Sequence, residues 1–236
     1  MRWAALALAL ALVSTPATAE ITAARYIDPT TRYAHGVLGD AIEHETLEVT
    51  MSGGQTARIH WPDTVVFEDT NPRVIDVTGD GKSDVIVVEA HEDQGARLAI
   101  YGLADGTLVR LAETPWIGRS NRWLAPVGAA DLDGDGAIEI AYIDRPHLAK
   151  TLRVWRYDGG ALTQIAHLAG LTNHRIGERD IAGGIRDCGS GPEMIVADAT
   201  WAQIMAVRLL EGTALQATPI APHQGRSSFT KVLRCQ

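Results

Sequence analysis

Two short stretches of the chain combine acidic residues and glycines at spacings that suit metal binding. They read DVTGDGKSD (76–84) and DLDGDGAIE (131–139), and each lies between two apolar runs. Carboxylates packed this closely repel one another unless a cation lies among them, and hard oxygen donors at this density suit Ca²⁺. The glycines permit the tight turn that such a site needs. We therefore predict two calcium loops, which use the side chains of Asp131, Asp133, Asp135 and Glu139 and of Asp76, Thr78, Asp80 and Asp84.

An EF-hand is the main alternative to this interpretation, because its loop begins with a similar pattern of acids. That loop requires a bidentate glutamate at position twelve and a helix on each side. Counted from the first acid, position twelve is Tyr142 in one stretch and Val87 in the other. The flanking segments, VIVV (85–88) and IEIAYI (138–143), have the composition of strands. A strand–loop–strand calcium site is favoured, and a solvated acidic turn without metal stays open.

The first 19 residues have the pattern of a secretory signal peptide. Arg2 precedes an apolar run from Trp3 to Val13, and the segment ends in Ala-Thr-Ala. We expect cleavage before Glu20 and export to the periplasm or beyond the cell; a retained N-terminal anchor is the alternative.

Loss of Arg2 changes the formal net charge from −8 to −9. Such an acidic chain is not suited to nucleic acid or to an anionic membrane. No second apolar run is long enough to span a membrane, so we expect no membrane span in the mature chain. We also expect a monomer.

Two cysteines, Cys188 and Cys235, fall in the expected mature chain. An even count in an oxidising compartment predicts one disulfide, and two buried free thiols are the alternative. The bridge would attach the C-terminal tail to the last repeat. No C-x-x-C pair is present, which disfavours zinc.

The two acidic loops mark an internal repeat, since Asp80 and Asp135 are 55 residues apart. Each loop is followed by an apolar strand, a second strand, an Asp-Gly turn and a third strand. Weaker copies occur at 34–51 and 185–201, where the paired acids are missing, and we expect these loops to have lost a strong metal site. The sequence thus divides into units at about 30–69, 70–115, 116–170 and 171–222.

Repeated units of four strands predict an all-β fold, a small β-propeller of about four or five blades formed as a single domain by 20–236. The remaining segments, 21–28 and 227–236, also have strand-like patterns. One of them is predicted to complete the sheet of a terminal blade, with the disulfide closing the ring.

These repeats resemble the FG-GAP/VCBS family, the repeats of integrin-alpha-like propellers, most closely at DLDGDGAIE and less closely at DVTGDGKSD. The resemblance implies a propeller with calcium held in the loops between the first two strands of a blade. It further implies that the carbonyl groups of Ala137 and Lys82 complete the two ligand sets.

No recognisable catalytic motif is present: His91-Glu92 does not continue to HExxH, and the serine of Gly189-Ser190-Gly191 is not in a G-x-S-x-G elbow. We expect a non-enzymatic, calcium-stabilised, exported propeller that presents loops to a protein or glycan partner. One alternative is a lectin-like propeller. In a lectin, four tryptophans would stack on sugar instead of packing between blades. These are Trp61, Trp123, Trp155 and Trp201.

A further alternative is a hydrolase or lyase that uses the central funnel of the propeller. A separate alternative is a funnel that binds an anion, because four arginines precede the loops at nearly equivalent places and would line it. They are Arg32, Arg73, Arg122 and Arg179.

Overall fold

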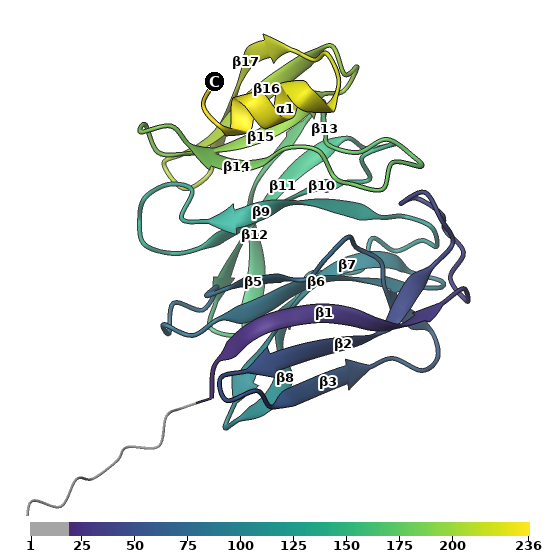
Figure 1. Ribbon diagram of the computed structural model, residues 1–236. Helices are drawn as coiled ribbons and strands as arrows, with labels where there is room; N and C mark the ends of the chain where they lie inside the picture. The colour runs from purple at the N-terminus through teal and green to yellow at the C-terminus, as the bar shows by residue number, and fades with distance from the viewer. Residues whose placement is uncertain (1–18) are drawn as a thin grey trace, which may run out of the picture.

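The computed structural model describes residues 19–236, and it shows antiparallel sheets stacked face to face (Figure 1). The prediction of an all-β, propeller-like fold is confirmed by 17 strands and one short helix in this range. The predicted signal peptide, apart from its last residue, lies outside the described residues. No helix in 19–236 has the length and apolar character needed to cross a membrane.

The first sheet contains eight strands and combines the first two units predicted from the sequence. The order β1-β2-β4-β6-β7-β8 is continuous, while β3 pairs with β2 and β5 pairs with β6. β4 is the link, because it pairs with β2 on one side and β6 on the other. The predicted N-terminal strand is confirmed as β1, which completes the sheet beside β2. The strands are β1 (Ile21–Thr30), β2 (Glu43–Met51), β3 (Thr56–His60), β4 (Val65–Phe67), β5 (Arg73–Ile75), β6 (Asp84–His91), β7 (Gly95–Ala104) and β8 (Thr107–Glu113).

The second and third sheets repeat a simple antiparallel plan of four consecutive strands. The second sheet has the order β12-β11-β10-β9, and the third contains β14 to β17 with the short β13 added beside β15. β5 to β8 follow the same plan within the first sheet. The strands are β9 (Leu124–Ala130), β10 (Glu139–Asp144), β11 (Thr151–Asp158), β12 (Ala161–Ala169), β13 (Leu171–Thr172), β14 (Gly184–Asp187), β15 (Pro192–Asp198), β16 (Gln203–Leu210) and β17 (Ala214–Pro222).

The apolar runs seen in the sequence are central strands with both faces buried. Along β6, Ile86 and Val88 belong to a core shared with the second sheet, whereas Val85 and Val87 pack in a core with β1 and β2. The same division occurs on β10 and β15, whose odd and even positions enter different cores. Alternation of side chains between the two faces of a strand explains the pattern. Each sheet is thereby fixed against its neighbours.

The C-terminal segment corrects one prediction, because it forms the helix α1 (Arg226–Leu233) instead of a strand. Phe229, Val232 and Leu233 have i, i+3, i+4 spacing, which places them on one helical face. Phe229 and Val232 are buried against the third sheet.

The predicted disulfide is confirmed: Cys188 and Cys235 are bonded, with Cα atoms 5.8 Å apart. The bridge connects the end of α1 to the β14–β15 loop of the same sheet. It therefore attaches the tail to the last repeat, as predicted, but does not join the last unit to the first.

Candidate functional site

The loop between β9 and β10, 131–139, brings together three of its four predicted acidic ligands. Carboxylate oxygens of Asp131, Asp133 and Glu139 all lie within 4.8 Å of one another, the only such group of acids, histidines or cysteines among the described residues. Asp131 accepts hydrogen bonds from the backbone N–H groups of Gly134 (2.7 Å) and Gly136 (3.0 Å). Both glycines have a positive φ, as the sequence led us to expect. The loop is thus a tight turn that gathers negative charge.

Arg156 supplies positive charge to this loop, and the sequence analysis missed it. It lies on β11 directly opposite Glu139. Its guanidinium contacts Glu139 (Nε–Oε1, 2.7 Å), Asp133 (Nη2–Oδ2, 2.9 Å) and Asp135 (Nη1–Oδ2, 2.8 Å). Burial raises the pKa of Glu139, while a hydrogen bond from the Leu132 N–H and the contact with Arg156 act to lower it. One guanidinium therefore partly compensates three carboxylates.

The loop between β5 and β6, 76–84, has the same backbone turn but a different charge arrangement. Asp76 accepts from the N–H groups of Gly79 (2.7 Å) and Gly81 (2.8 Å). Asp84 accepts from the Val77 N–H (3.0 Å), and burial raises its pKa. Among the described residues, the carboxylate oxygens of Asp76, Asp80 and Asp84 do not all lie within 4.8 Å of one another.

No arginine can occupy the place opposite Asp84, because the register of β6 and β7 puts Gly102 there. A Cβ atom at Gly102 would lie 2.6 Å from a carboxylate oxygen of Asp84. This loop thus lacks the cross-strand cation of the 131–139 loop.

The fourth unit repeats the arginine arrangement. Glu193, which aligns with Glu139, accepts hydrogen bonds from Arg208 on β16 (2.9 Å) and from Arg186 on β14 (2.8 Å). The turn before it retains one acid, Asp187, bonded to the N–H groups of Gly189 and Gly191. A cross-strand arginine beside the last acid is therefore common to the third and fourth units.

The oxygen donors of the 131–139 loop suit Ca²⁺ in type and density, but Arg156 already contacts three of them. A calcium ion would have to displace the guanidinium or share the carboxylates with it. The Arg156 side chain is 25% exposed and so has a route towards solvent. The predicted ligands thus fit calcium only in competition with a cation that the protein supplies itself.

The comparisons with known proteins bear directly on these loops. Residues 76–142 match the family model of the FG-GAP-like repeat. The match begins at the first acid of one loop and ends within β10, so it includes both acidic loops. The predicted resemblance is confirmed over this range. A comparison with curated proteins found no match to the chain.

The four arginines predicted to line a funnel do not meet in one place. Arg73 and Arg179 line one cavity of about 390 Å³ beside the FG-GAP-like repeat. Arg73 is paired there with the buried Asp69. Arg32 instead binds backbone carbonyl groups of the first unit, and Arg122 lines a separate small cavity.

A polar cluster that the sequence did not reveal joins the FG-GAP-like repeat to the first and fourth units. The indole N–H of Trp123 donates to the backbone carbonyl of Glu68 (2.8 Å), and the ring packs edge-on to His174. Nearby, Glu43 is only 2% exposed; burial and the neighbouring Glu68 raise its pKa to about 9. Trp123 and Glu68 are 55 residues apart, so no local pattern could have indicated this contact.

Proposed function

We propose that this protein acts after export as a non-enzymatic interaction module whose acidic loops respond to calcium. The FG-GAP-like repeat at 76–142 carries this proposal, because such repeats are typical of β-propeller interaction modules. The disulfide is compatible with an oxidising compartment. The stacked sheets supply a rigid frame, and loops on such frames commonly carry binding functions.

The surface proposed to meet a partner is the rim formed by the β5–β6, β9–β10 and β14–β15 loops. These loops are 76–84, 131–139 and 187–191, and consecutive sheets place them along the same side of the stack (Figure 1). A photoreactive residue at Asp135, which is exposed, should crosslink a partner in the native exported fraction. The matched control is Asp93, exposed in the β6–β7 turn at the opposite rim. Equal crosslinking from both positions would exclude the acidic rim as the binding surface.

Calcium is proposed to bind the 131–139 loop weakly, because it must compete with Arg156. The proposed ligands are the Asp131, Asp133, Asp135 and Glu139 side chains and the Ala137 carbonyl; the second loop would use Asp76, Thr78, Asp80, Asp84 and the Lys82 carbonyl. A dissociation constant near 1 mM is common in extracellular calcium modules and would stabilise the fold by about 1.4 kcal/mol in 10 mM calcium. That corresponds to a rise in Tm of about 3–5 °C for a domain of this size.

The test is a thermal melt in 10 mM CaCl₂, in 10 mM MgCl₂ and in excess chelator. A Tm raised by calcium alone supports the proposal, and equal Tm values in all three solutions reject the calcium component.

Export is tested separately by N-terminal sequencing of the exported protein. A first residue of Glu20 supports cleavage at the predicted position, and retention inside the cell would refute export.

A further inference from the structure

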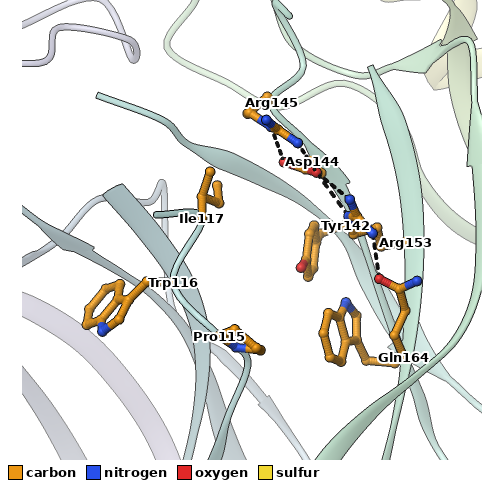
Figure 2. A pocket seen from close by; sticks show the side chains of 9 residues that line it. Pro115, Trp116, Ile117, Tyr142, Asp144, Arg145, Arg153 and Gln164 are labelled. Atoms are coloured by element: carbon orange, nitrogen blue, oxygen red, sulfur yellow. Dashed lines mark hydrogen bonds and ion pairs between the residues drawn. The ribbon is translucent and has the colours of Figure 1, made fainter. Parts of the chain in front are cut away.

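A cavity of about 220 Å³ opens between the second sheet and the segment that connects β8 to β9 (Figure 2). Pro115, Trp116 and Ile117 from that segment line one side. The other side is built by alternate residues of β10 and β11, which share a face, and by one residue of β12. These are Tyr142, Asp144, Arg153, Trp155 and Gln164.

The polar groups at the cavity are held in fixed positions. Asp144 is 3% exposed and accepts hydrogen bonds from Arg145 (2.8 and 2.9 Å) and from Arg153 (2.9 Å). Arg153 also donates to the side-chain carbonyl of Gln164 (2.6 Å), as the dashed lines in Figure 2 show. Two guanidinium groups therefore share one carboxylate, and the lining carries one net positive charge.

Trp155 contributes a buried hydrogen-bond donor without a well-oriented acceptor. The residue is 9% exposed and lines the cavity, and its indole N–H makes no hydrogen bond of good geometry among residues 19–236, although the Tyr142 side chain lies close to it. A buried donor without a partner costs about 1–3 kcal/mol, so an acceptor in the cavity would be favoured.

The aromatic rings give the cavity a flat apolar surface. Trp155 and Tyr142 lie nearly parallel, with centroids 6.2 Å apart and an interplanar angle of 18°. Burial, with a smaller effect from Asp144, raises the pKa of Tyr142, so the phenol keeps its proton. Aromatic side chains of this kind combine an apolar face with a polar edge.

We propose that this cavity binds a carboxylate-bearing sugar ring, that is, a uronic acid residue. The carboxylate would compensate the unshared positive charge of Arg145 and Arg153, with charge-assisted hydrogen bonds. The apolar face of the pyranose would lie against Tyr142 and Trp155. Its hydroxyl groups would meet the indole N–H and the Gln164 amide.

The observations favour a sugar over the carboxylate end of a peptide. Peptides commonly bind by extending an exposed strand edge, but β10 and β11 are paired on both sides. The lining thus offers side chains and no free backbone edge from these strands. This inference is independent of the calcium loops and of a partner at the acidic rim, so it can fail while the proposed function stands.

The test is calorimetric titration of the purified chain with galacturonate, glucuronate and mannuronate trisaccharides. The comparison ligands are the matching neutral trisaccharides and an acetylated tripeptide with a free C-terminal carboxylate. We expect at least one uronate to bind at least 10-fold more tightly than its neutral counterpart, and more weakly as salt increases. Absence of uronate binding at millimolar concentration, equal binding of the neutral sugar, or tighter binding of the peptide would overturn the proposal.

Two variants test the residues, each after its fold has been checked by circular dichroism. Trp155→Phe keeps an aromatic ring but removes the N–H, and Arg145→Gln removes the net charge at a half-exposed position. Arg145→Gln should weaken uronate binding about 10-fold, the effect of one charge-assisted hydrogen bond, and Trp155→Phe should weaken it about 3- to 10-fold, the effect of one neutral hydrogen bond. Trp201→Phe, in the fourth unit, is the matched control and should bind normally. Wild-type affinity in both cavity variants would overturn the assignment, and Arg145→Gln alone decides the matter if Trp155→Phe does not fold.

Discussion

Replacement of Arg156 by glutamine tests whether this arginine acts as the internal counter-cation of the 131–139 loop. The variant would leave Asp133, Asp135 and Glu139 without their shared guanidinium, and Glu139 has a side chain that is 0% exposed. Removal of one partner from a buried ion pair costs about 3–5 kcal/mol. Arg156 is 25% exposed, and solvent screening lowers that figure. We therefore expect a loss of about 2–3 kcal/mol in the free energy of unfolding at pH 7 in chelator.

Calcium should recover much of this loss, because it no longer competes with a guanidinium for these carboxylates. The assay is urea unfolding of wild type and variant, each in chelator and in 10 mM CaCl₂. The calcium-dependent increase in stability should be larger in Arg156→Gln than in wild type. Arg208→Gln is the matched control, because Glu193 would still be paired with Arg186. A loss below about 0.5 kcal/mol in chelator, or the same calcium response in both proteins, would refute the counter-cation role.

Two further predictions concern the disulfide and a buried acid. Cys188→Ser combined with Cys235→Ser should lower the free energy of unfolding by about 2–4 kcal/mol, because the bridge closes a loop across a sequence separation of 47; unchanged urea midpoints under oxidising conditions would contradict this. The raised pKa of Glu43, about 9, means that the folded state retains a proton that the unfolded state has already released above its ordinary pKa near 4.5. This contribution to stability is complete below pH 4.5 and is lost as pH rises towards 9, by about 2–4 kcal/mol between pH 5 and pH 8. Glu43→Gln should flatten this part of the pH profile, and parallel profiles for variant and wild type would contradict the assignment.

Local patterns in the sequence were sufficient to predict the strands beside the acidic loops and the turns of these loops. The apolar run at 85–88 predicts a buried strand, and both faces of this strand do enter cores. The glycines of the two loops predict tight turns, and these turns have the expected positive φ angles. The spacing of the acids also predicts their convergence at 131–139.

Features that depend on pairing between distant strands could not be predicted in this way. Arg156 enters the acidic loop only because the register of β10 and β11 places it opposite Glu139. Gly102 occupies the corresponding place in the other loop, and the sequence pattern of that loop gives no sign of it. The short β4 pairs with both β2 and β6 and so joins two predicted units. The repeat pattern in the sequence gives no indication of this pairing. The strand predicted within 227–236 was wrong because Phe229, Val232 and Leu233 have helical spacing, which lets a helix bury Phe229 and Val232 against the third sheet.

The position of α1 also determines how the stack of sheets ends. The third sheet presents one apolar face to the second sheet and the other to Phe229 and Val232 of the helix. A further sheet, from this chain or from another copy, would need that same outer face. The helix therefore covers the outer face of the third sheet, and the disulfide holds the end of the helix to the β14–β15 loop of that sheet.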